Sequence, residues 1–258
     1  MDLGWHLVAF LVTAALVAGW VDAVVGGGGL IQLPSLLIGL PADTPVATVS
    51  GTNKISSAAG TLVATGTYLR KVKVQWLYAL PLMLAAYVGS SIGARLVTLM
   101  PREWFTPIVL VALIGVGWYT VRRPQMGLNH EVRRSGWPLA LMMTAIGLVI
   151  GIYDGFLGPG TGSFFVIALV AILGYGFLQA SAMAKLANLT TNVAAIVVLH
   201  DVINWKIGLA MATANLTGGF VGAAMAVRWG NAFVRRVFLV VVVVLGLRLA
   251  WDTVRMVL

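Results

Sequence analysis

The 258-residue sequence contains no cysteine and very little charge. The absence of cysteine excludes disulfide bonds, thiolate metal sites and a cysteine nucleophile, and it leaves the redox compartment undetermined. Charged residues make up 10% of the chain, whereas soluble globular proteins have about 25%. Because 60% of the residues are hydrophobic, too few polar side chains remain to cover the molecule in water. The composition therefore predicts a membrane protein and excludes nucleic-acid binding.

Catalytic and metal-binding motifs are missing as well. His6, His130 and His200 are scattered, and none has a second histidine or a carboxylate at ligand spacing on one helix, so we expect no metal site. No Gly-x-Ser-x-Gly or His-Glu-x-x-His motif is present. The glycine-rich runs lack the Gly-Lys-Ser/Thr and the βαβ pattern of a nucleotide-binding loop. We therefore expect neither an enzyme nor a bound cofactor.

Long apolar runs dominate what the sequence does contain. A transmembrane helix needs about 20 mostly apolar residues. This length predicts eight spans, at residues 4–25, 46–69, 74–98, 103–121, 137–157, 179–199, 205–227 and 233–254. Two shorter apolar runs, 26–41 and 158–175, begin with glycines and are too short to be ordinary spans. We expect them to form half-membrane helices within an all-α polytopic fold.

The two halves of the chain resemble each other. A hydrophilic linker, 122–136, separates a first transmembrane repeat, 1–121, from a second, 137–258. Asp22 and the glycines after it match Asp154 and its glycines at a shift of 132 residues. Lys54 then matches Lys185 at a shift of 131, and Gly89 matches Gly218. Three matches in the same order indicate a duplication, with four long helices and one half-membrane helix in each repeat.

Basic residues predict the topology. Ten of the 17 lie in three connecting segments, at 70–73, 122–134 and 228–236, so the linker is expected to be cytoplasmic. An odd number of crossings per half would invert the repeats and place ten basic residues on one side against four. An even number would make the repeats parallel and place nine against five. The count therefore favours inverted repeats, a common transporter architecture, by one residue.

Lys54 and Lys185 lie deep within predicted spans, where burying a charge costs at least about 2.5–3.5 kcal/mol. Asn53 stands beside the first lysine, and Asn188 and Asn192 lie within two helical turns of the second. Side chains of this kind line water-filled cavities, and ammonium and amide donors would suit a small oxyanion. A structural interpretation stays open, in which each lysine hydrogen-bonds carbonyl groups of its own half-helix.

Asp22 and Asp154 form a matching acidic pair, each four residues before a glycine that breaks its helix. In one interpretation they take up and release protons during transport, since burial favours the neutral form of a carboxyl group. In the other they are structural. Each would then accept hydrogen bonds from backbone amides freed at the break, or would neutralise one of the lysines.

Two glycine-rich segments are predicted to bring backbone amides close to a ligand, because glycine adopts positive φ and the short helices that follow present anion-binding N-termini. The candidate residues are Gly27, Gly28 and Gly29 in the first half and Gly160, Thr161 and Gly162 in the second. Other glycines have small-xxx-small spacing, which predicts close helix packing. They are Gly89, Gly93, Gly218, Gly219 and Gly222.

Three stretches in combination resemble the sulfite exporter TauE/SafE family: Asp22 to Pro34, the Thr-Asn-Lys at 52–54, and Tyr153 to Phe165 with the later Ala184-Lys185-Leu. The resemblance covers nearly the whole chain. It implies a bacterial inner-membrane secondary transporter of sulfite, sulfonates or related small organosulfur anions. It also points to the two glycine-rich breaks and to Asn53, Lys54 and Lys185, and it leaves the particular anion open.

The expected partners are a small anionic substrate and the lipid bilayer. Two other functions stay open at this point: a passive channel for the same anions, and a membrane subunit that scaffolds another protein without transporting anything. The short loops argue against the scaffold, because no soluble segment is longer than the linker. The sequence also leaves open whether the protein forms a homodimer.

Overall fold

The structure is a computed structural model that describes residues 5–41, 43–101, 132 and 135–257. The regular elements of these residues are all helices, as predicted. They are α1 (Trp5–Val25), α2 (Gly29–Gly39), α3 (Val46–Leu69), α4 (Trp76–Val97), α6 (Gly136–Phe156), α7 (Thr161–Ala171), α8 (Phe177–Leu199), the 3-10 helix η1 (His200–Val202) and α9 (Trp205–Val257). The predicted span 103–121 and most of the linker lie outside the described residues.

Five of the described helices are long and apolar enough to cross a membrane: α1, α4, α6, α8 and the first part of α9. The prediction of a multi-pass membrane protein is therefore confirmed. Helix α3 has the predicted bounds but is not among the five, because it carries many polar residues. Most of these polar side chains are buried, and α8 and α9 pack against the helix. A helix enclosed in this way does not need an apolar surface all round.

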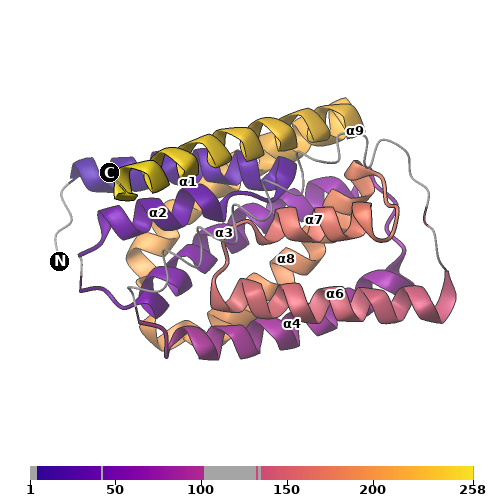
Figure 1. Ribbon diagram of the computed structural model, residues 1–258, viewed down its shortest axis with the longest axis horizontal. Coiled ribbons are helices and arrows are strands. Elements are labelled where there is room, and N and C mark those ends of the chain that lie inside the picture. The colour runs from indigo at the N-terminus through magenta and orange to yellow at the C-terminus, as the bar shows by residue number, and fades with distance from the viewer. Residues whose placement is uncertain (1–4, 42, 102–131, 133–134, 258) are drawn as a thin grey trace.

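The two short helices fold back along their predecessors. Gly28 lies against Ala18, and at the far end of α2 Gly39 lies against Leu7 and Leu11, so α2 returns alongside α1. Helix α7 returns alongside α6 in the same manner (Figure 1). Each of these hairpins has its tip inside the bundle, which brings a polar chain reversal into the interior of the molecule.

Helices of one half pack along helices of the other. The largest contacts join α4 to α6 and α1 to α9, and these pairs form opposite faces of the bundle (Figure 1). A Cβ added at Gly93 of α4 would overlap the Ile152 carbonyl oxygen of α6, and one at Gly218 of α9 would overlap the Leu16 carbonyl oxygen of α1. The prediction that these glycines serve close helix packing is confirmed.

The bundle has two distinct ends. We call the first the terminal end, where α1, α3 and α9 begin and Val8, Thr48 and Ile207 line one pocket. At the opposite end, which we call the linker end, α4 and α6 begin, and the Gly136 amide donates to the Tyr78 hydroxyl at 2.8 Å. Figure 1 shows the start of α1 and the end of α9 at the terminal end and the start of α6 at the linker end.

Helix α9 contains the last two predicted spans, 205–227 and 233–254. Between them Gly230 has φ 69° and ψ −161°, so the helix is broken there. The second part of α9 turns back toward the terminal end (Figure 1). The two predicted spans therefore correspond to two helical segments, and a single glycine provides the bend between them.

Because α4 packs closely on α6, one added methyl group at their contact is predicted to lower the stability of the folded protein. We expect Gly93→Ala to lower the melting temperature of the detergent-purified protein by several degrees, because the methyl group overlaps backbone that cannot move aside. Gly66→Ala on α3 is the matched control, since nothing lies within 4 Å of its added Cβ. Equal melting temperatures for the two variants would contradict the packing argument.

Candidate functional site

Two buried ion pairs join the halves of the chain. The Lys54 ammonium on α3 donates to an Asp154 carboxylate oxygen on α6 at 2.5 Å. The Lys185 ammonium on α8 donates to Asp22 on α1, to a carboxylate oxygen at 2.8 Å and also to the backbone carbonyl oxygen. Each lysine is therefore paired with the aspartate of the opposite half.

The four charged residues are almost completely withdrawn from solvent. Lys185 is 0% exposed, Lys54 and Asp154 are 1% exposed, and Asp22 is 7% exposed. A charge buried at this depth is costly unless an opposite charge and hydrogen bonds compensate it. Asp22 also accepts from the Gly28 amide and from the Thr61 hydroxyl, each at 3.4 Å. Asp22 thus neutralises a lysine and accepts a hydrogen bond from a backbone amide at the chain break. These are the two structural roles that the sequence suggested for it.

The two glycine-rich breaks touch each other in the middle of the bundle. Gly26 has φ +82°, and a Cβ on it would overlap the backbone of Gly162. Across this contact the Ser163 amide donates to the Gly26 carbonyl oxygen at 3.1 Å, and its hydroxyl donates to the Val25 carbonyl oxygen at 2.8 Å. Only residues without side chains permit this approach, so the glycines hold the tips of the two hairpins together.

A small polar cavity of about 10 Å³ lies at the meeting point of the hairpins and the ion pairs, with room for about one water molecule. Its lining consists of Asp22, Gly26, Gly29, Asn53, Lys54, Ser57, Asp154, Gly158, Thr161, Gly162, Asn188 and Asn192. We call it the central cavity. Both halves of the chain contribute to it. Its two lining carboxylates belong to the two ion pairs that join the halves, which we call the crossed ion pairs.

Most of the residues singled out in the sequence meet in the central cavity. Four of them do not line it: Lys185, Gly27, Gly28 and Gly160. Lys185 reaches the site indirectly through Asp22, and so does Gly28, whose amide donates to the same carboxylate. Gly160 has φ +77° immediately before α7, where it shapes the turn into that helix.

Ser57, Gly26 and Gly158 line the cavity but were not predicted as site residues. The hydroxyl of Ser57 accepts from the Asn192 amide at 3.4 Å and so joins α3 to α8. One signal could have revealed Ser57, because it lies four residues after Asn53 and therefore on the same face of the helix. Gly26 and Gly158 are the matched positive-φ positions of the two breaks, at +82° and +86°.

The arrangement provides both donors and acceptors for a small polar ligand. The N-termini of α2 and α7 face the cavity through Gly29 and Thr161, and helix N-termini favour anions. The side-chain oxygen of Asn53 is buried with no hydrogen-bond partner among the described residues. A buried polar atom of this kind is a natural contact for a ligand. Broken helices with opposed termini near the midplane are typical of secondary transporters.

Comparison with known proteins gives the family. The sequence profile of the sulfite exporter TauE/SafE family matches residues 11–249. The chain belongs to this family. No solved structure matches the chain.

Several TauE/SafE relatives cover the chain almost from end to end. It is 37% identical to the probable membrane transporter protein ORF9 of a Sinorhizobium species, over 97% of this chain and 95% of the relative. It is 32% identical to a probable membrane transporter protein of Haemophilus influenzae, over 98% of each. It is also 32% identical to the probable membrane transporter protein YfcA of Escherichia coli K12, over 96% of this chain and 91% of the relative. The TauE/SafE chain is thus a membrane transporter.

The crossed ion pairs predict a specific pattern of stability. We expect Asp154→Asn alone to destabilise the transporter strongly, by about 3–5 kcal/mol, because it leaves the Lys54 ammonium buried and unpaired. The double variant Lys54→Gln/Asp154→Asn removes both charges and should be clearly more stable than Asp154→Asn. Thermal unfolding of the purified variants measures the difference.

Lys206→Gln is the matched control for this experiment, since Lys206 is exposed at the start of α9. Its melting temperature should equal that of the unaltered protein. Effects of Lys54→Gln and Asp154→Asn that simply add in the double variant would show that the two residues do not stabilise each other, contrary to the structure.

Proposed function

We propose that the protein is a secondary carrier of small sulfur-containing anions, such as sulfite or a sulfonate, which bind in the central cavity. The observation that carries this proposal is the enclosed cavity where Lys54, two helix N-termini and the amides of Asn188 and Asn192 converge. These groups suit an oxyanion. The family name, sulfite exporter, supports a sulfur oxyanion as the class of cargo.

The size of the cavity favours a carrier over a passive channel. At about 10 Å³ it accommodates about one water molecule, which is far less than a continuous aqueous pore needs. A substrate therefore enters only when the helices around the cavity separate. That step is characteristic of alternating access, in which one part of a transporter moves against the other around a fixed site.

Charge balance supports coupling to protons. With both lysines protonated and both aspartates ionised, the four buried side chains carry no net charge. A bound anion adds a negative charge, which is costly in a low-dielectric interior. A proton taken up by Asp22 or Asp154 restores neutrality and leaves the neighbouring ammonium free to contact the anion. We therefore propose that anion and proton bind together, with the two aspartates as the proton acceptors.

We further propose that the two halves are inverted repeats related by a pseudo-two-fold axis. Exchange of matched elements supports this relation: α1 packs on α9 as α6 packs on α4, and α3 packs on α8. The ion pairs follow the same exchange, since Lys54 contacts Asp154 and Lys185 contacts Asp22. Helix α1 begins at the terminal end and α6 at the linker end, as expected when one repeat is turned over.

Basic residues support an orientation in which the linker end faces the cytoplasm, with the protein in a bacterial inner membrane. The described basic residues that follow α3 or flank the break in α9 lie at the linker end: Arg70, Lys71, Lys73, Arg228, Arg235 and Arg236. The terminal end has two described acidic residues, Asp43 and Asp201, beside Arg95 and Lys206. The positive-inside rule then directs the linker end inward.

Cysteine labelling tests this orientation cleanly, because the natural chain has no cysteine. Asp43→Cys at the terminal end and Lys73→Cys at the linker end each introduce one thiol at an exposed position. We expect a membrane-impermeant maleimide to label Asp43→Cys in intact spheroplasts and to label Lys73→Cys only after permeabilisation. The reverse pattern would contradict the orientation, and labelling of both from outside would contradict a membrane crossing by α3.

Transport assays in proteoliposomes test the function. We expect the purified protein to accumulate labelled sulfite or sulfoacetate when a proton gradient is imposed. The charge-free variant Lys54→Gln/Asp154→Asn should lose at least about 90% of the rate, because it lacks an ammonium donor and a proton acceptor in the cavity. The control Lys71→Gln, at an exposed lysine that lines neither the central cavity nor the terminal-end pocket, should retain the rate. Flux that ignores the proton gradient would overturn the coupling, and no flux of either anion would overturn the substrate class.

A further inference from the structure

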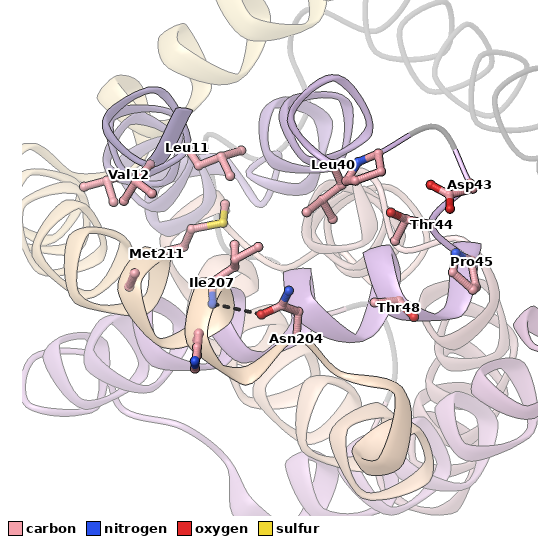
Figure 2. Close-up of a pocket in the computed structure, with 14 residues that line it drawn as sticks. Leu11, Val12, Leu40, Asp43, Thr44, Pro45, Thr48, Asn204, Ile207 and Met211 are labelled. Atoms are coloured by element: carbon pink, nitrogen blue, oxygen red, sulfur yellow. Dashed lines mark hydrogen bonds between the residues drawn. The ribbon is translucent and has the colours of Figure 1, made fainter. Parts of the chain in front are cut away.

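The side-chain contacts of Asp22 lie far from the pocket at the terminal end. This pocket has a volume of about 690 Å³, and Figure 2 shows Leu40 and Met211 reaching into it. It shares no lining residue with the central cavity. Thr61, whose hydroxyl donates to Asp22 at 3.4 Å, lies about 20 Å further along α3 than Thr48 of the pocket. Asp22 therefore meets α3 nearer to the linker end of that helix.

Four buried hydroxyl groups, each at most 5% exposed, gather beside Asp22. They are those of Thr61, Thr65 and Tyr68 on α3 and Ser181 on α8. The three on α3 share one face of the helix, because they are spaced by four and three residues. The Tyr68 hydroxyl donates to the carbonyl oxygen of Ala23, the residue after Asp22, at 3.0 Å, and it lies near the Ser181 side chain. We call these four residues the hydroxyl cluster.

On α8 the cluster stands between the linker end and the ion pair of Asp22. The helix begins at the linker end, where its Leu178 amide donates at 2.7 Å to Asn231 beside the break in α9. Ser181 comes next along the helix, and Lys185, which contacts Asp22, follows one turn later. The residues of α8 that line the central cavity come only after Lys185.

Helix α3 runs the other way and gives the same order. Counted from the linker end, where the helix ends at Leu69, Tyr68 and Thr65 come first. Thr61, which contacts Asp22, lies one turn beyond Thr65. The residues of α3 that line the central cavity come only after Thr61. Both helices thus place the cluster on the linker-end side of the cavity, and it extends over about 10 Å of α3.

Two hydroxyl groups of the cluster, those of Thr65 and Ser181, have no hydrogen-bond partner of ordinary geometry among the described residues. Serine and threonine within a helix often donate to the carbonyl oxygen one turn earlier, as Thr67 does to Val63 at 2.9 Å. Thr65 and Ser181 make no such bond, so the helices do not account for their hydroxyl groups. A buried hydroxyl whose donor and acceptor are both free is a natural contact for a water molecule.

The other ion pair lacks an equivalent cluster. At the shift of 131 residues that relates the two lysines, Thr65 corresponds to Ile196 and Tyr68 to Leu199. The other two matched positions are polar, Ser50 and Asn192. Because isoleucine and leucine have no donor or acceptor, a line of hydroxyl groups is present beside one ion pair and interrupted beside the other. The two aspartates therefore differ in their surroundings although their ion pairs match.

Few titratable groups lie near Asp22. Lys185 on α8 contacts it, Tyr68 on α3 lies close to it, and the other ion pair faces it across the central cavity. Helices α2 and α7 and residues 207–227 of α9, which also pack on α1, contain no titratable side chain. A proton that passes along the cluster therefore reaches the Asp22 carboxylate before any other carboxylate.

We propose that the hydroxyl cluster is the path by which protons pass between Asp22 and the linker end. The inference rests on the proposed proton-coupled function and names the aspartate and the side of the membrane. Water molecules held by Thr65 and Ser181 complete the path. Each hydroxyl oxygen accepts one proton and passes its own to the next acceptor, so the hydroxyl group is unchanged after each transfer. Asp22 gains the proton and loses its charge, which weakens its attraction for Lys185.

Removing hydroxyl groups tests the path while leaving side-chain volume nearly unchanged. We expect Tyr68→Phe to lower proton-driven uptake of labelled sulfite into proteoliposomes at least about tenfold, since positioned proton-transfer groups commonly contribute more than this. The double variant Thr65→Val/Ser181→Ala should act in the same direction. Exchange of labelled for unlabelled sulfite should keep its rate in both variants, because it requires no net movement of protons.

Thr67→Val is the matched control on the same helix, since the Thr67 hydroxyl donates to its own helix. It should retain both the uptake rate and the exchange rate. Proton-driven uptake that Tyr68→Phe and Thr65→Val/Ser181→Ala leave unchanged would overturn the inference. An equal loss of uptake and exchange would overturn it as well, because the hydroxyl groups would then serve the structure rather than the proton.

Infrared spectroscopy tests the path without sulfite. In oriented membrane vesicles, a light flash releases protons from a caged compound at the linker end, and the band of the protonated carboxyl group is followed. We expect this band to be lost in Asp22→Asn/Lys185→Gln, which removes the ion pair as a unit. It should rise about tenfold more slowly in Tyr68→Phe than in Thr67→Val.

The same rate of rise in Tyr68→Phe and Thr67→Val would contradict the path, as would the absence of an Asp22 band in the unaltered protein. A faster rise when protons are released at the terminal end would contradict the side. Absence of sulfite and sulfoacetate flux in the unaltered protein overturns the proposed substrate class alone, because the infrared measurement uses neither anion.

Discussion

The cost of placing charge inside a membrane protein is the constraint on which the rest of this structure depends. Lys54 and Lys185 are each almost fully buried, and neither could remain charged there without a partner. Each finds its carboxylate in the opposite half of the chain. The halves therefore cannot separate fully without exposing four charges to a low-dielectric interior. The ion pairs hold the two halves together, and an anion bound in the central cavity as proposed would compete with those pairs.

The glycines make this electrostatic arrangement sterically accessible. The tips of the two hairpins meet at Gly26 and Gly162, where any side chain would collide with the opposite backbone. The same contact brings the ends of α1 and α6, which carry the aspartates, to the lysines of α8 and α3. Close approach along α4 and α6 likewise depends on glycine. Backbone contact thus sets where the hairpin tips and the charged residues lie, and the ion pairs stabilise this arrangement.

Several features were predictable from local pattern. Apolar run length gave the helices and most of their bounds, and burial cost alone identified Lys54 and Lys185 among the basic residues. Other features were not predictable. The Asn215 side-chain amide on α9 donates to the Gln32 side-chain oxygen on α2, 183 residues away, and nothing in the local sequence of either residue indicates the other. Ser57 was not predicted as a site residue, although its spacing of four residues from Asn53 places both on the same face of α3.

The sequence by itself determined that this is a helical membrane protein with buried lysines, matched aspartates and two glycine-rich breaks. Composition, the length of apolar runs and the spacing of repeated motifs can be measured along the sequence without knowing which residues are in contact. Only the tertiary structure decided which aspartate each lysine contacts, because both pairings are compatible with the same sequence. It also decided that the breaks meet tip to tip, since that contact depends on how α1 and α6 are directed by packing against α9 and α4.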